Sequence, residues 1–179
     1  MVFLFLAEGF EIIEALAPVD MLRRAKLDIK TVGVTCKTVT SSCGVAVNAD
    51  ITADEFVYEN VDAIILPGGM PGTLNLENNQ VVQSAIDKAV SNNALICAIC
   101  AAPSILGHKG LLKGKNAIAF PGFEKDLDGA EISSEHVTVD GNFITAKGAG
   151  VAAEFGLKIV EMLTDKATAD NIKETIQCR

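Results

Sequence analysis

The stretch that decides the fold is residues 94–103, which read Ala94-Leu95-Ile96-Cys97-Ala98-Ile99-Cys100-Ala101-Ala102-Pro103. It begins as a short apolar run, which is typical of a strand buried on both faces of a parallel sheet. It ends with Pro103, a residue favoured in the first turn of a helix because its missing N–H group costs nothing there. The chain is therefore expected to turn sharply between a strand and a helix, with Cys100 at the turn.

Residues 98–102 have the pattern small-x-Cys-x-small, which is that of a nucleophile elbow. Small outer residues let the backbone pass close to itself, and a helix N-terminus directs N–H groups at the sulfur, which favours a reactive thiolate. A cysteine can also be a small buried hydrophobic residue. We favour that interpretation for Cys97, inside the strand, whereas the spacing alone leaves both interpretations open for Cys100.

Composition narrows the class of protein. The chain has 179 residues, 49% of them hydrophobic and 21% charged, and a formal net charge of −8. Residues 1–179 are therefore expected to form one domain, and no basic patch indicates nucleic acid or an anionic membrane as a partner. The apolar N-terminus is too short for a signal peptide, and no segment is long enough to cross a bilayer. Five scattered cysteines fit neither a disulfide framework nor a zinc site, which favours the reducing cytoplasm.

The remaining periodicity predicts strands that alternate with helices. We expect core strands at 2–6, 28–35, 62–66 and 94–99, a short strand at 116–120, and hairpins within 36–48 and 137–146. Helices are expected at 11–25, 80–92, from Pro103 onward, from the Gly148-Ala149-Gly150 turn to Leu163, and at 166–177. This order predicts an α/β protein, a three-layer α/β/α sandwich with a flavodoxin-like, mostly parallel sheet.

Ligands of such sheets bind outside the carboxyl ends of the strands, and three of those ends carry unusual residues. Glu14 follows the first strand, Gly68 and Gly69 follow the third, and Cys100 stands at the elbow. Taken alone, Glu14 is better interpreted as a solvated helix position, and the two glycines as turn residues. Their coincidence with the elbow makes them candidate site residues.

Five segments in this order resemble the ThiJ/PfpI superfamily, in the branch that includes the Parkinson's-disease-associated protein deglycase, which is glyoxalase III-like. The segments cover residues 7–14, 18–24, 66–69, 98–103 and 145–150. The resemblance spans nearly the whole chain and implies a class I glutamine amidotransferase-like domain. It also implies that Cys100 is the reactive nucleophile, that Glu14 is the acid/base group beside it, and that Gly69 and Ala101 form an oxyanion hole.

The resemblance further implies a homodimer, a substrate pocket lined by Gly68 and Phe120, and no cofactor or metal. Phe120 departs from the family pattern, because some members have a histidine before the residue that matches Pro121. Gly148-Ala149-Gly150 stands where some relatives have Gly-Pro-Gly, and Cys43 stands near a position where some have an arginine at the dimer interface. The apolar character of the helix after the first strand agrees with an interface between two copies.

Two functions remain open on these residues. The first is a cofactor-independent glyoxalase or deglycase that acts on methylglyoxal-type 2-oxoaldehydes or their protein adducts. The second is a redox sensor in which Cys100 is oxidised and the dimer serves as a stress-linked chaperone or regulator. A cysteine peptidase or amidase is disfavoured, since Ala101 replaces the histidine of the protease-like branch and no histidine follows His136.

The protonation of the candidate pair is also predicted. A thiolate and a carboxylate in contact repel, so one of the two groups should hold a proton at neutral pH. Backbone N–H groups favour the charge on sulfur, and apolar neighbours disfavour it on Glu14. We therefore expect a Cys100 thiolate beside a protonated Glu14.

Overall fold

In a computed structural model of the protein, residues 1–178 are described, and Arg179, the last residue of the expected domain, lies outside the described residues. Its centre is a seven-stranded sheet in the order β5-β2-β1-β6-β7-β11-β10. All neighbouring pairs are parallel except β10 and β11, which are antiparallel. The order β2-β1-β6-β7-β11 is the flavodoxin-like arrangement, which confirms the predicted fold class.

The strands of this sheet are β1 (Val2–Leu6), β2 (Ile29–Gly33), β5 (Ile51–Thr52), β6 (Ala63–Leu66), β7 (Leu95–Ile99), β10 (Val137–Asp140) and β11 (Phe143–Ala146). Two smaller ladders pair β3 (Thr38–Thr40) with β4 (Ala46–Asn48), and β8 (Asn116–Ala117) with β9 (Glu131–Ile132). The helices are α1 (Ile12–Arg24), α2 (Gly72–Glu77), α3 (Gln80–Ser91), α4 (Pro103–His108), α5 (Ala152–Leu163) and α6 (Lys166–Thr175).

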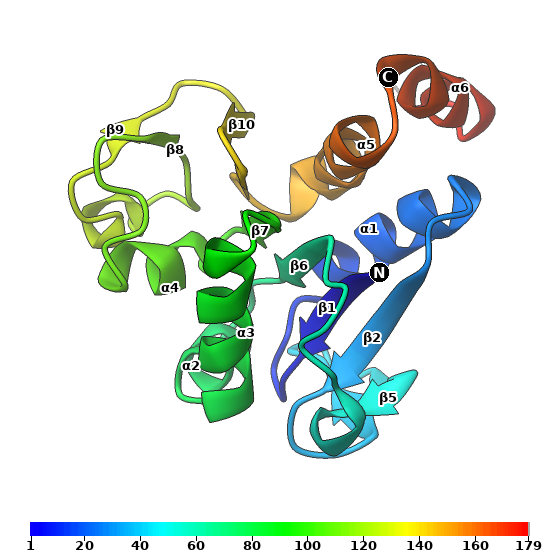
Figure 1. Ribbon diagram of the computed structural model, residues 1–179, viewed down its shortest axis with the longest axis vertical. Coiled ribbons are helices and arrows are strands. Elements are labelled where there is room, and N and C mark those ends of the chain that lie inside the picture. Colours follow the sequence, from blue (N-terminus) through cyan, green and yellow to red (C-terminus); the bar gives the residue numbers. More distant parts are fainter. Residues whose placement is uncertain (179) are drawn as a thin grey trace.

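The helices lie in two layers, with α1, α5 and α6 on one face of the sheet and α2, α3 and α4 on the other (Figure 1). Alternate residues of each central strand supply the two cores, because successive side chains of a strand point to opposite faces. Leu4 and Ile65 pack toward α1 and α5, whereas Phe5 and Ile64 belong to the core under α3. The sheet is therefore buried on both faces, as its apolar strands predict.

Local sequence signals explain where several helices begin. Glu11 caps α1 by accepting a hydrogen bond from the Glu14 N–H at 2.7 Å. Asn79 caps α3 through the N–H groups of Val81 and Val82, and Asp165 caps α6 through that of Thr168. Such caps satisfy N–H groups that have no partner within the helix.

Several boundaries differ from the expectations. The 36–48 hairpin forms its own ladder, and the edge strand of the main sheet is the unpredicted β5. The expected strand at 116–120 is reduced to β8, because the chain from Ala119 turns toward the elbow and the Phe120 N–H donates to the Cys100 carbonyl. Helix α2 was not predicted, since Gly72 and Pro71 resemble turn residues. Among residues 1–178, no helix is long and apolar enough to cross a membrane.

Candidate active site

Cys100 lies at the sharp turn between β7 and α4. Its φ angle is +66°, a left-handed conformation that is uncommon for a residue with a side chain and that often marks a functional site. Its N–H donates to the Ala146 carbonyl at 2.9 Å, which ties the turn to the end of β11. Pro103 is at the first position of α4, as predicted. The backbone therefore has the geometry of a nucleophile elbow.

Glu14 lies in the first turn of α1 and is fully buried, so it is not a solvated helix position. Its Oε2 atom accepts a hydrogen bond from the Gly68 N–H at 3.0 Å. The other oxygen, Oε1, has no hydrogen bond of ordinary geometry within residues 1–178. A buried carboxyl oxygen of this kind is costly unless the group has a chemical task or a bound partner.

The Gly68-Gly69 turn brings these two side chains together. A Cβ atom on Gly68 would lie 2.6 Å from Glu14 Oε2 and 2.7 Å from Cys100 Cβ, so only glycine fits between them. Gly69 has a φ angle of +93°, and a Cβ there would lie 2.4 Å from the Glu11 backbone nitrogen. Gly68 thus allows the close approach of the carboxyl and the thiol, and Gly69 lets the turn pack against the backbone of residues 9–11.

The environment changes the acidity of both groups. Burial raises the pKa of Glu14 from 4.5 to about 7, although the Cys100 thiol and the N–H groups of Gly68 and Ala149 act in the opposite direction. Burial, followed by the charge of Glu14, raises the pKa of Cys100 from 9.0 to about 12. Hydrogen bonding from the N–H groups of Ala101 and Gly69 opposes that rise.

The environment of the sulfur opposes the predicted thiolate, because it raises the pKa of Cys100. Burial of the sulfur, followed by the charge of the neighbouring Glu14, raises its pKa by more than the N–H groups of Ala101 and Gly69 lower it. The pKa values of both groups are raised, so the pair carries at most one negative charge near neutral pH. The pair consequently offers a carboxyl group that ionises near neutral pH next to a thiol, which is the arrangement of a general base beside a nucleophile.

Phe120, which was predicted with Gly68 to line the substrate pocket, lies beside the pair of Cys100 and Glu14 and does not come between them. Phe120 lines a cavity together with His136 and residues 147–151. The two histidines are not part of the pair, since His136 is exposed and His108 Nδ1 contacts Glu77 Oε1 on α2 at 2.6 Å. Within residues 1–178, neither histidine is therefore a member of the Cys100–Glu14 pair.

The turn after β11 also belongs to the site, although none of its residues is among the predicted site residues. The Ala149 N–H acts on the Glu14 carboxyl, and a Cβ atom on Gly148 would lie 3.9 Å from Oε1. The available signal was the small-residue run Gly148-Ala149-Gly150, which follows a strand at the same carboxyl edge of the sheet. Four strand ends, and not three, therefore surround the pair.

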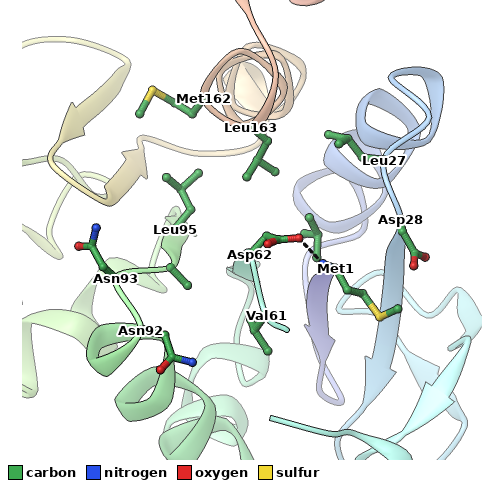
Figure 2. Close-up of a pocket in the computed structure, with 12 residues that line it drawn as sticks. Met1, Leu27, Asp28, Val61, Asp62, Asn92, Asn93, Leu95, Met162 and Leu163 are labelled. Atoms are coloured by element: carbon green, nitrogen blue, oxygen red, sulfur yellow. Dashed lines mark hydrogen bonds and ion pairs between the residues drawn. The ribbon is translucent and has the colours of Figure 1, made fainter. Parts of the chain in front are cut away.

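A second cavity, of about 550 Å³, lies at the opposite end of the parallel strands, where β1, β6 and β7 begin (Figure 2). It is bounded by the ion pair of the Met1 amine with Asp62 and by Met162 and Leu163 of α5. Figure 2 shows neither Glu14 nor Cys100 among its lining residues. This cavity is therefore separate from the candidate site.

Comparisons with known proteins agree with this geometry. The model of the DJ-1/PfpI family matches residues 1–162. Protein DJ-1 homolog A of Arabidopsis thaliana is 33% identical over 178 residues, which are 97% of this chain and 45% of that protein. The chain thus spans less than half the length of that relative. Glutathione-independent glyoxalase DJR-1.2 of Caenorhabditis elegans is 31% identical over 157 residues, which cover 87% of this chain and 84% of that protein.

The fold agrees with solved structures of the same group. The oxidised DJ-1 of Toxoplasma gondii superposes with a TM-score of 0.94 at 32% identity, and the match covers 98% of this chain and 97% of that one. The central sheet, the flanking helices and the sequence match all point to one family. The chain belongs to the DJ-1/PfpI family.

Proposed function

We propose that this protein is a cofactor-independent glyoxalase or deglycase that acts on 2-oxoaldehydes or their early protein adducts. The observation that carries the proposal is the fully buried Glu14 carboxyl, whose pKa lies near 7 and whose Oε1 is left without an ordinary hydrogen bond beside Cys100. The relative from Caenorhabditis elegans is named a glutathione-independent glyoxalase, which supports the assignment.

The first step is addition of sulfur to the aldehyde. Glu14 takes the thiol proton while Cys100 Sγ forms a bond to the aldehyde carbon, and it then passes that proton to the aldehyde oxygen, which gives a hemithioacetal and frees the carboxylate for the next step. The N–H groups of Gly69 and Ala101, which hydrogen-bond toward the sulfur, are positioned to stabilise the negative charge that develops on the neighbouring oxygen. No external electron acceptor is needed, because over the whole reaction the aldehyde carbon is oxidised to the level of a carboxylic acid while the ketone carbon is reduced to an alcohol.

The second step moves hydrogen between the two carbons. Glu14 removes a proton from the former aldehyde carbon and returns a proton to the adjacent carbon, so that the hemithioacetal becomes a 2-hydroxy thioester. Water then cleaves the thioester, which releases a 2-hydroxy acid and restores the thiol. Methylglyoxal and one water molecule would give lactate. Without an imidazole beside the thiol, turnover is expected to be slow.

The test is conversion of methylglyoxal to lactate by the purified protein in the absence of glutathione. Wild type should produce lactate, and the Cys100→Ser and Glu14→Gln variants should not. Lactate formation that persists in Cys100→Ser would contradict the proposal. Cys36→Ser is the matched control, because Cys36 is an exposed thiol that lies in the loop before β3.

A redox function on the same residues has an observation of its own in its favour. The solved Toxoplasma gondii relative is an oxidised form, and Glu14 and the two N–H groups around Cys100 could hydrogen-bond oxygen atoms added to the sulfur. Peroxide would oxidise the thiol to a sulfenic and then a sulfinic acid, and would itself be reduced to water. A sulfinic acid that forms at Cys100 with substoichiometric turnover of methylglyoxal would favour this function over the glyoxalase.

A homodimer is proposed as the working assembly. Ile13 on α1 is 53% exposed and Val45 before β4 is 48% exposed, so apolar side chains are available for a contact between two copies. Light scattering at micromolar concentration should give twice the mass of the chain. A monomer mass would contradict the proposal. The exposed thiols of Cys36 and Cys43 favour a reducing, cytoplasmic location for either function.

A further inference from the structure

A cavity of about 380 Å³ lies beside the catalytic pair and has no task in the steps above. It is lined by Phe120, Pro121, His136, Lys147 and residues 148–151. Its volume is in the range of small-molecule sites. The Phe120 ring is 47% exposed, and an aromatic side chain left half exposed at a concave surface is typical of a ligand contact.

Two contacts connect this cavity with the reacting groups. The Phe120 N–H donates to the Cys100 carbonyl at 2.8 Å, so the ring begins at the backbone of the elbow. Gly148 separates the ring from the carboxyl, since a Cβ atom there would lie 3.2 Å from Phe120 Cδ2 and 3.9 Å from Glu14 Oε1. A molecule bonded to Cys100 Sγ would therefore have this cavity within reach of its next carbons.

The chemistry of the lining narrows what the cavity can hold. Phe120, Pro121 and Val151 offer apolar surface, whereas the side chains of His136 and Lys147 are basic. The pKa of the exposed Glu124 is lowered first by backbone N–H groups, its own and that of Gly122, and also by the charge of Lys147, so the Lys147 charge is partly balanced from outside the cavity. Such a lining accommodates an apolar group and disfavours a positively charged one.

We propose that this cavity is the subsite for the substituent on the ketone carbon of the 2-oxoaldehyde, and that Phe120 and Val151 select aryl or branched alkyl substituents over methyl. The proposal rests on the proposed function and specifies its substrate class. Burial of the larger substituent against Phe120 should favour phenylglyoxal over methylglyoxal by about tenfold in kcat/KM, the discrimination that a few extra carbon atoms give in an apolar pocket.

The first experiment compares the kcat/KM ratio of phenylglyoxal to methylglyoxal among variants. Phe120→Ala should lower the ratio about tenfold, and Val151→Asn should lower it by a smaller factor; the ratio cancels any effect that a variant has on both substrates alike. Met162→Ala is the matched control, since it removes a half-exposed apolar side chain from the cavity at the opposite end of the parallel strands (Figure 2). An unchanged ratio in folded Phe120→Ala and Val151→Asn would overturn the proposal.

A second experiment measures the subsite without turnover. Cys100 is alkylated by phenacyl bromide or bromoacetone, a reaction in which a C–S bond forms, the C–Br bond breaks and bromide leaves with the thiol proton released to Glu14 or solvent. The rate of each reagent with Cys100 is divided by the rate of the same reagent with glutathione, which corrects for the intrinsic reactivity of the reagent. The normalised ratio should favour phenacyl bromide in wild type and in Met162→Ala, and should fall in Phe120→Ala.

The two experiments separate the subsite from the reaction. A ratio that depends on Phe120 in alkylation, with no turnover of either oxoaldehyde, would support the apolar subsite and overturn the glyoxalase. Turnover with equal kcat/KM for both substrates and no dependence on Phe120 would support the glyoxalase and overturn the subsite. Failure in both experiments would overturn both.

Discussion

Cys97 and Cys100 lie three residues apart in one segment, yet they occupy different chemical environments. Cys97 is inside β7, fully buried against Ile65 and Ile144 of the neighbouring strands, and its pKa is raised by burial alone. Cys100 is partly exposed at the turn, where a carboxyl and two backbone N–H groups act on its sulfur. The difference shows that a thiol of this protein becomes reactive at the end of a strand, where a proton acceptor is beside it. A thiol buried within the sheet has no proton acceptor.

The largest expected effect that tests this comparison is on catalysis. Cys100→Ser should lower glyoxalase turnover by about 1,000-fold or more, because the nucleophile that forms the covalent intermediate is lost. Cys97→Ser should leave turnover within a few-fold and instead lower the free energy of unfolding by about 1–3 kcal/mol, since a hydroxyl group would be buried among apolar residues. Lactate assays and urea unfolding of both variants measure this, and equal loss of turnover in the two would contradict it.

The next effect is on chemical modification. In the native protein Cys100 should react with iodoacetamide at least about 100-fold faster than Cys97, because modification of a fully buried thiol requires the sheet to open. We also expect Cys100 to react ahead of Cys36, Cys43 and Cys178, through the assistance of Glu14. Peptide mapping at short reaction times measures the order. Early modification of Cys97 would show that β7 is not a protected strand.

A smaller effect concerns stability and pH. The pKa of Glu14 is raised in the folded protein, so its stabilising contribution is fully present below pH 4.5 and is lost as the pH rises through about 7. The rise from 4.5 to about 7 corresponds to about 3 kcal/mol. The free energy of unfolding of wild type should therefore fall by up to about 3 kcal/mol relative to Glu14→Gln between pH 4.5 and pH 8. Parallel pH curves for the two proteins would contradict the burial of an ionisable Glu14.

The smallest effect is expected at Phe120. Phe120→His places an imidazole where some relatives carry one, and should keep the assembly while raising methylglyoxal turnover by no more than about tenfold, since general acid/base assistance from Glu14 is already present. The assay is lactate formation with light scattering as the check on assembly. A folded variant that is no faster would show that the missing histidine does not limit the rate.

The fold could be predicted from the sequence where the pattern alone determines the structure. The apolar runs of β1, β6 and β7 and the small residues around Cys100 predicted the parallel sheet and the elbow correctly. The two-residue strands β5, β8 and β9 were missed or misjudged, because strands of that length carry no periodicity. Helix α2 was missed because Pro71 and Gly72 are also turn residues.

The sequence predicted which residues come together at the candidate site, but not how the structure changes their pKa values. Glu14, Gly68, Gly69 and Cys100 meet because parallel strands end at one edge of the sheet, which the alternation of elements implies. Desolvation depends on how deeply each group is covered in three dimensions. The sequence therefore indicated that one proton is shared, but not that burial raises the pKa of both groups, and only the small-residue run Gly148-Ala149-Gly150 signalled that Ala149 lies near the carboxyl.

The central claim is that Glu14 is the base that activates Cys100, and the pH dependence of Cys100 alkylation tests it most directly. The rate constant for iodoacetamide is measured from pH 5 to pH 10 by mapping the Cys100 peptide in wild type and in Glu14→Gln. The account predicts that the wild-type rate rises with a midpoint near pH 7, as Glu14 ionises, and that Glu14→Gln lacks this rise and reacts only as the thiol itself ionises at higher pH. Superimposable profiles, or a wild-type rate that is already maximal at pH 5, would contradict it.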